Sequence, residues 1–337
     1  TLDLPRLLRT IMFFTFVCEA FGSFLLMLRF VPMFGGKGIW ISVFLSVSAY
    51  CNAGFDILGF LKPDASLELF VGDPLVCLTI CCLIILGGIG FIVTVDLYNW
   101  GRKRVRKEER RPHLTLHTRI VLVSTASLLV LGTVLTLGLE YDHTLKDLNF
   151  WEKLNASFFQ SVTARTAGYA TIPQGELGDA TKLVTIILMF IGASPSSTGG
   201  GIKTTTFVVL VATVVSISRG RDETVINKRR VDKSVVYRAM TIVAMAFLVI
   251  AITSGVIMVT TPPEVSAIDA VYEAVSAFGT VGLTTGLTPD LSIVAKILVM
   301  LTMFIGRVGP ISLVLALTMK HSGGPGKILP EGKVIVG

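Results

Sequence analysis

Charged side chains are scarce in this sequence. Only 16% of its 337 residues are Asp, Glu, Lys or Arg, whereas a soluble domain carries about 25%. Hydrophobic residues make up 52% of the chain, and the mean hydropathy is +0.74. This balance argues against a soluble domain and predicts an all-α integral membrane protein that crosses the bilayer several times.

Residues that hold metals or carry out catalysis are also few. The five cysteines all lie in apolar stretches, and no histidine or acidic residue joins Cys77 and Cys81 in a ligand set. The four histidines form no zinc-binding pattern such as HExxH. The apolar runs contain no paired acids and no Ser beside a base. We therefore predict buried free thiols, no enzyme activity and no covalently bound cofactor.

The basic residues are concentrated rather than spread over the chain. The net charge is +7, and 13 of the 30 Lys and Arg residues lie in two short segments between apolar runs, 99–116 and 219–234. Basic segments beside membrane spans stay in the cytoplasm. We therefore predict two cytoplasmic linkers that contact lipid headgroups, with a cytoplasmic partner as the alternative use, and no nucleic acid as a partner.

Six apolar runs reach the roughly 20 residues that a membrane span requires. They are Leu7–Phe30, Leu75–Val95, Ile120–Leu139, Leu183–Ile202, Ala239–Thr261 and Ile297–Met319. Three shorter apolar segments, Ile39–Tyr50, Leu154–Thr163 and Ile268–Phe278, lie between paired spans and are too short to cross. The sequence thus predicts a unit of span, half-helix, glycine loop and span that occurs three times.

One short pattern follows each half-helix, and its glycines are separated by 114 residues in both intervals. The copies read Asn52-Ala53-Gly54-Phe55, Thr166-Ala167-Gly168-Tyr169 and Thr280-Val281-Gly282-Leu283. Glycine permits the backbone conformations that turn carbonyl groups toward an ion, and the C-terminus of a half-helix carries partial negative charge. We therefore predict a selectivity filter in which the first three residues of each copy bind a dehydrated cation.

A second glycine-rich segment interrupts the span Leu183–Ile202. It reads Gly192-Ala193-Ser194-Pro195-Ser196-Ser197-Thr198-Gly199-Gly200-Gly201-Ile202-Lys203. Glycine costs about 1 kcal/mol and proline about 3 kcal/mol in a helix interior, so the helix should break here. Backbone exposed in lipid must then line water or protein. A polar helix kink is the alternative, and the spacing does not fit a phosphate-binding loop because Ser197 and Ile202 occupy its glycine positions.

Three charged residues are expected at membrane depth. Arg307 lies inside the last span, where an arginine costs about 2.5–3.5 kcal/mol unless it faces the protein interior. Arg165 directly precedes a filter motif, and Glu273 lies in the last half-helix. We expect Arg165 and Glu273 to brace the filter, with Arg165 bonded to nearby backbone or to Glu273. A fixed salt bridge to an acidic residue is the alternative for Arg307.

These motifs together resemble those of the Trk/Ktr/HKT superfamily of potassium transporters. The three filter motifs, the segment 192–203 and the run Phe304-Ile305-Gly306-Arg307-Val308-Gly309-Pro310 carry the resemblance, which extends from about Leu7 to the end of the chain. The tail Pro330-Glu331-Gly332-Lys333 is similar to the bacterial Ktr membrane subunit. The resemblance implies potassium uptake across a bacterial plasma membrane, with sodium as a candidate coupling ion.

The resemblance also implies an architecture. Members of the superfamily have four repeats around a pseudo-fourfold pore, whereas three are visible here. Residues 1–98, 117–218 and 235–320 would correspond to the second, third and fourth repeats, followed by a cytoplasmic tail at 321–337. We therefore expect this sequence to be a fragment of a longer chain.

The resemblance further assigns roles outside the filter. Segment 192–203 would be an intramembrane gating loop, and Arg307 would project into the pore below the filter and slow cations when the gate is closed. The expected partners are a second copy of the chain, in a homodimer, and a cytoplasmic nucleotide-binding regulatory ring. An alternating-access cation symporter and the channel-like subunit of a potassium-pumping ATPase are the alternative functions.

Overall fold

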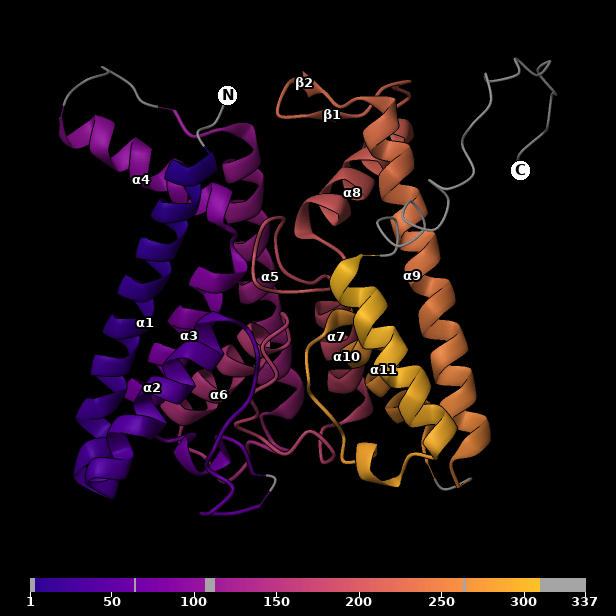
Figure 1. Cartoon of the computed structure of the whole chain (residues 1–337). Helices are drawn as coiled ribbons and strands as arrows, with labels where there is room; N and C mark the ends of the chain where they lie inside the picture. The colour runs from indigo at the N-terminus through magenta and orange to yellow at the C-terminus, as the bar shows by residue number, and fades with distance from the viewer. Residues whose placement is uncertain (1–3, 64, 107–112, 263–264, 310–337) are drawn as a thin grey trace.

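The computed structural model describes residues 4–63, 65–106, 113–262 and 265–309 (Figure 1). Within these residues the fold is helical, apart from one two-stranded hairpin. The end of the last predicted span, the motif residue Pro310 and the tail 321–337 lie outside the described residues. The boundaries predicted for the three repeats and the linkers stay predictions.

The first unit contains α1 (Leu4–Phe34), α2 (Gly36–Tyr50), the short η1 (Glu68–Phe70), α3 (Pro74–Gly88) and α4 (Phe91–Val105). The half-helix α2 occupies the predicted segment. At the start of α3, the Asp73 side chain accepts hydrogen bonds from two backbone N–H groups, and Pro74 follows where no N–H is needed.

The predicted span Leu75–Val95 is not one straight helix. Helices α3 and α4 meet at an angle of 98°, with the break at Ile89 and Gly90. Gly90 has a φ of 91°, which other residues adopt with difficulty. The backbone N–H of Phe91, freed by the break, donates to Ser196 O at 2.8 Å. A contact from a distant loop therefore replaces the helical hydrogen bond that the break removes.

The second unit contains α5 (Leu116–Glu140), α6 (Phe150–Thr163), α7 (Asp179–Phe190) and α8 (Thr204–Ser218). Asn149 and Glu152 form a capping box at the start of the half-helix α6. The predicted interruption of Leu183–Ile202 is confirmed, because α7 ends at Phe190 and α8 begins at Thr204. A backbone bridge between Ile191 and Ile202 joins the two ends of the intervening loop.

The third unit contains α9 (Lys233–Thr260), α10 (Ala267–Gly279), the short η2 (Thr288–Asp290) and α11 (Ile293–Val308). Before α9, strands β1 (Val225–Ile226) and β2 (Arg229–Arg230) pair antiparallel in a small hairpin that the sequence did not predict. Figure 1 shows the β1–β2 hairpin and α4 at one end of the molecule, and the half-helices α2, α6 and α10 toward the other.

The long helices show the exposure that lipid contact requires. In the described part of the chain, three helices are long and apolar enough to cross a membrane by themselves, Leu8–Phe34, Leu116–Glu140 and Lys233–Thr260, and the bent pair α3–α4 passes the same test when it is taken together. Large apolar side chains on α1, α5 and α9 remain exposed, whereas α10 is largely buried. The half-helix α10 thus lies inside a shell of longer helices, whereas α2 and α6 are exposed where they begin and buried where they end.

Small residues allow the outgoing helices to touch the ends of the half-helices. A Cβ atom at Gly87 would lie 2.0 Å from Tyr50 O, and one at Gly306 would lie 1.8 Å from Phe278 O. Tyr50 and Phe278 each lie four residues before a filter glycine. The helix that leaves the first unit and the helix that leaves the third therefore contact the half-helix at the same place.

We expect Gly306→Val to lower the free energy of unfolding by about 1–3 kcal/mol, because the new side chain would overlap the backbone of α10. Thermal unfolding of the purified protein in detergent would measure this loss. Gly255→Val in α9 is the matched control, since nothing lies within 4 Å of a Cβ atom at Gly255. Equal stability of the two variants would contradict the packing argument.

A candidate ion pathway

The three glycine motifs adopt the same unusual backbone conformation. The first and third residues of each copy have positive φ angles: Asn52 (50°), Gly54 (71°), Thr166 (72°), Gly168 (92°), Thr280 (51°) and Gly282 (93°). In each copy this first residue lies one to three residues after the end of the half-helix. The sequence spacing thus corresponds to a repeated local geometry.

The three hairpins meet at one centre. A Cβ atom at Gly54 would lie 2.2 Å from Ala167 O, and one at Gly168 would lie 2.2 Å from Val281 O. The Asn52 amide also reaches Thr166 Oγ1 at 3.3 Å. Gly54, Gly168 and Gly282 line the same cavity of about 400 Å³. Each hairpin therefore touches the next through backbone, and the available space would not admit a larger residue at Gly54 or Gly168.

Hydrogen bonds outside the cavity hold the hairpins in place. Tyr169 Oη donates to Phe55 O of the neighbouring hairpin at 3.1 Å, and Ser48 Oγ donates to the same carbonyl at 2.7 Å. Thr163 Oγ1 donates to Tyr169 O at 2.6 Å. The motif residues Phe55 and Tyr169 thus join two hairpins, a role that sequence reasoning did not assign to them.

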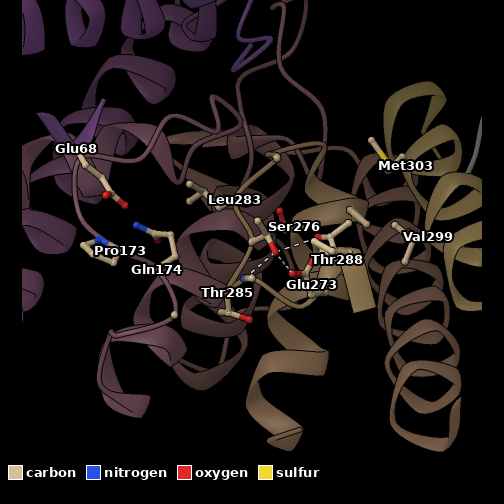
Figure 2. Close-up of a pocket in the computed structure, with 16 residues that line it drawn as sticks. Glu68, Pro173, Gln174, Glu273, Ser276, Leu283, Thr285, Thr288, Val299 and Met303 are labelled. Carbon is tan, nitrogen blue, oxygen red and sulfur yellow. Dashed lines mark hydrogen bonds between the residues drawn. The ribbon is translucent and has the colours of Figure 1, made fainter. Parts of the chain in front are cut away.

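Glu273 lies beside the third hairpin. Its carboxylate accepts hydrogen bonds from Thr284 Oγ1 and, at 3.1 Å, from Thr288 Oγ1. Glu273 lines a cavity of about 640 Å³. Figure 2 shows Glu68 and Gln174 on the side of this cavity opposite Glu273. Gly282 lines this cavity too. The carboxylate therefore connects the half-helix α10 to the chain that follows its filter motif.

Arg165 does not pair with Glu273, so that expectation is wrong. Arg165 Nη2 donates weakly to Thr125 Oγ1 at 3.4 Å, and its Nε has no hydrogen-bond partner among the described residues. The residue is buried and lines a small cavity with Gly88 and Ala193. Arg165 lies three residues before the glycine of its motif, Gly168, whereas Glu273 lies nine residues before the glycine of its own motif, Gly282. The two positions therefore differ in depth by about 9 Å along a helix. The Glu273 carboxylate instead accepts its hydrogen bonds from Thr284 and Thr288.

The loop between α7 and α8 lies directly against the three hairpins. A Cβ atom at Gly199 would lie 2.1 Å from Thr166 Oγ1, and one at Gly200 would lie 2.2 Å from Thr280 Oγ1. Thr198 Oγ1 donates to Tyr50 O at 3.2 Å. The run of glycines is therefore required by close contact with the filter threonines, and not by flexibility alone.

The same loop is fixed by hydrogen bonds to the broken span. Ser194 N donates to Gly88 O at 3.0 Å, and Thr198 N donates to Gly87 O at 3.3 Å. A Cβ atom at Gly90 would lie 2.4 Å from Pro195 O. These contacts satisfy loop backbone at membrane depth and explain why α3 and α4 separate where they do.

The charged groups near the loop also have definite positions. Lys203 Nζ donates to Gly199 O at 2.7 Å, within the loop itself. Arg307, in the last turn of α11, interacts electrostatically with Lys203 and Cys51. Arg307 forms no ion pair with an acidic residue in the part of the chain that the structure describes. Its side chain is exposed, and its positive charge near Lys203 and Cys51 is not neutralised by a described acidic residue.

Half-helices that end at a common cavity, with a loop packed against the base of that cavity, define a pore-loop membrane protein. Comparison with protein families agrees with this class. The family model described as the cation transport protein TrkH matches residues 3–324. The chain belongs to this family, and it is a multi-pass membrane protein and not an enzyme.

Individual relatives are similar over most of their length. The chain is 36% identical to the Ktr system potassium uptake protein B of Bacillus subtilis, covering 98% of this chain and 71% of the relative. It is 38% identical to the potassium/sodium uptake protein NtpJ of Enterococcus hirae, over 98% of this chain and 72% of that relative. The crystal structure of the potassium transporter TrkH from Vibrio parahaemolyticus matches with a TM-score of 0.71 at 18% identity, covering 95% and 66%, which supports the fold.

The separate environments of Arg165 and Glu273 predict additive effects. We expect the changes in unfolding free energy of Arg165→Met and Glu273→Gln to add within about 0.5 kcal/mol in the double variant. Thermal unfolding would measure all three proteins. Lys182→Met with Asp269→Asn is the matched pair, because Lys182 Nζ lies 2.8 Å from Asp269 Oδ1 and these variants should be coupled. Clear coupling between Arg165 and Glu273 would restore the rejected ion pair.

Proposed function

We propose that this protein carries potassium ions across the plasma membrane, through the cavity where its three hairpins meet. The observation that supports this most strongly is the convergence of Gly54, Gly168 and Gly282 on one cavity. Backbone carbonyls at such a place can replace the water around a cation. The names of the relatives from Bacillus subtilis and Enterococcus hirae, both uptake proteins for potassium, agree with this function.

In this proposal the ion binds to the first three residues of each motif. The ligands are backbone carbonyls of Asn52, Ala53 and Gly54, of Thr166, Ala167 and Gly168, and of Thr280, Val281 and Gly282. The C-termini of α2, α6 and α10 add the partial negative charge of a helix end. Glu273, through its threonines, and Arg165, through Thr125, brace this filter.

Energy for uptake would come from the membrane potential. A negative interior favours entry of a cation by about 2.3 kcal/mol per charge for each 100 mV. Sodium is the second candidate ion, either as a coupling ion or as a substrate, because the Enterococcus hirae relative is named for both potassium and sodium.

The loop 192–203 serves as the gate. It contacts Thr166, Thr280 and the carbonyl of Tyr50 directly, so an ion leaving the filter meets it first. Arg307 and Lys203 add positive charge beside the loop and oppose a cation in this position. Opening requires the glycines to move away from the filter threonines.

Regulation would come from the cytoplasmic side. The β1–β2 hairpin and α4 lie at the same end of the molecule, and both carry basic residues (Figure 1). We assign this end to the cytoplasm. It would contact a nucleotide-binding regulatory ring, with two copies of the chain forming a homodimer.

Substitution of one filter glycine tests the proposed function. We expect Gly168→Ala to reduce potassium uptake into liposomes by about tenfold or more, because its Cβ atom would collide with Val281 O and raise the barrier by at least about 1.4 kcal/mol. Uptake of a radioactive potassium tracer measures this. Gly138→Ala in α5, where nothing lies within 4 Å, should retain uptake. If Gly168→Ala transports as well as the unsubstituted protein, the filter is elsewhere.

Removal of the charge at Arg307 tests the gate. We expect Arg307→Ala to increase potassium flux several-fold, because a positive charge beside the loop would no longer oppose the ion. Arg102→Ala in α4 removes an equal charge from the exposed surface and should leave flux unchanged. Unchanged or lower flux in Arg307→Ala would show that Arg307 does not restrain the ion.

A further inference from the structure

An apolar groove lies between α7, α8, α9 and α10, separate from the ion cavity. Its volume is about 370 Å³, and its walls include Ile187, Phe190, Phe207, Phe247 and Ala251. Phe247 is 60% exposed and Ile187 is 51% exposed. The groove therefore opens toward the surroundings of the protein and is not a closed void in the core.

The groove lies at membrane depth. Phe247 and Ala251 lie 14 and 18 residues from the start of α9 at Lys233, near the middle of a helix of 28 residues. The surroundings of such a helix at this level are hydrocarbon. Water does not fill an apolar cavity, whereas an apolar molecule does. A lipid acyl chain is therefore the occupant available at this depth.

The walls of the groove include residues from both helices that flank the loop 192–203. Ile191 lines the groove and forms the backbone bridge to Ile202 at the other end of the loop. Phe207 lies in the first turn of α8, directly after the loop. The Phe190 ring packs against the Phe247 ring with centroids 4.9 Å apart. Anything that fills the groove therefore contacts the residues that position the loop.

Basic residues gather at the end of the same two helices. From Arg219, directly after α8, to Arg238 in the second turn of α9, the chain has seven basic and three acidic residues. Arg219 and Lys233 are exposed. Phe207 is 12 residues from Arg219, about 18 Å along a helix, which is close to the roughly 15 Å depth of one leaflet. A lipid with its phosphate at this end would reach the groove with its acyl chain.

We propose that the groove binds one acyl chain of an anionic phospholipid whose headgroup contacts the basic segment 219–238, which we name the basic collar. Each basic residue near a membrane surface strengthens attraction to an anionic lipid, by about fivefold in affinity. The bound acyl chain holds Ile191 and Phe207 in the arrangement seen here, in which the loop 192–203 lies against Thr166 and Thr280. Lipid binding at this site does not depend on the proposed potassium uptake. The effect of the lipid on potassium flux does rest on that proposed function.

Fluorescence quenching by brominated lipids tests the site. Trp40, Trp100 and Trp151 are replaced by Phe, and Phe247→Trp places one reporter in the groove. The protein is reconstituted in phosphatidylcholine that contains a small fraction of brominated phosphatidylglycerol or brominated phosphatidylcholine. We expect the phosphatidylglycerol to quench with an apparent affinity at least about fivefold higher. Leu248→Trp, on an exposed part of the same helix, is the matched reporter and should show no preference.

Two further variants separate the groove from the collar. Ala251→Phe fills the groove and should abolish the preference, whereas Ile252→Phe, at an exposed position of the same helix, should retain it. Arg219→Gln with Lys233→Gln leaves the groove intact and should also reduce the preference. Equal quenching by both lipids would show ordinary bilayer contact and overturn the proposal. Absence of quenching by either lipid would show a surface covered by protein, such as a second copy, and would overturn it too.

Flux measurements test the link to the gate. Potassium uptake should fall as the fraction of phosphatidylglycerol rises, and uptake by Ala251→Phe should not respond to it. If phosphatidylglycerol lowers uptake by Ala251→Phe as much as it lowers uptake by the unsubstituted protein, the lipid acts at another place. If no variant transports potassium under any lipid composition, the proposed function fails, while the quenching experiment still reports on the lipid site.

Discussion

Backbone polar groups cannot be left without hydrogen bonds inside a bilayer, and the architecture of this protein follows from that constraint. The half-helices α2, α6 and α10 end at membrane depth, where a chain in contact with lipid could not leave a helix. They end instead at a shared cavity, with their last turns buried among longer helices. The break between α3 and α4 obeys the same constraint, because the loop 192–203 supplies the carbonyl that Phe91 requires.

Close packing then couples the parts of the pathway. Glycines at 54 and 168 allow each hairpin to touch the next, and glycines at 199 and 200 allow the loop to touch Thr166 and Thr280. No side chain larger than hydrogen fits at these contacts without displacement of the neighbour. A movement of the loop therefore changes the surroundings of the filter threonines directly. The filter and the proposed gate are thus adjacent parts of one packed unit.

Much of this arrangement follows from local sequence patterns. The equal spacing of the glycine motifs and the short apolar segments before them predicted the half-helices, and the polar glycine run predicted the break after Phe190. The bend at Gly90 escaped prediction because Leu75–Val95 contains no charged residue, and the contacts that fix the break come from the loop 192–203, far along the chain.

The error at Arg165 and Glu273 had a different origin. Their opposite charges suggested a pair, but charge alone does not give depth along a half-helix, and the threonines that accompany Glu273 lie 11 and 15 residues later in the chain. The contacts of Tyr169 with Phe55 were likewise invisible, because they join separate repeats. Pairings between side chains distant in sequence require the assembled structure, whereas half-helices and glycine turns are encoded locally.

The central claim is that carbonyls from separate hairpins replace the water around one cation. Anomalous diffraction from crystals of the protein soaked in thallium, an electron-dense substitute for potassium, tests it most directly. The account predicts an anomalous peak at the centre of the cavity lined by Gly54, Gly168 and Gly282, within bonding distance of the motif carbonyls. Thallium bound to surface carboxylates, with no peak between the hairpins, would contradict it.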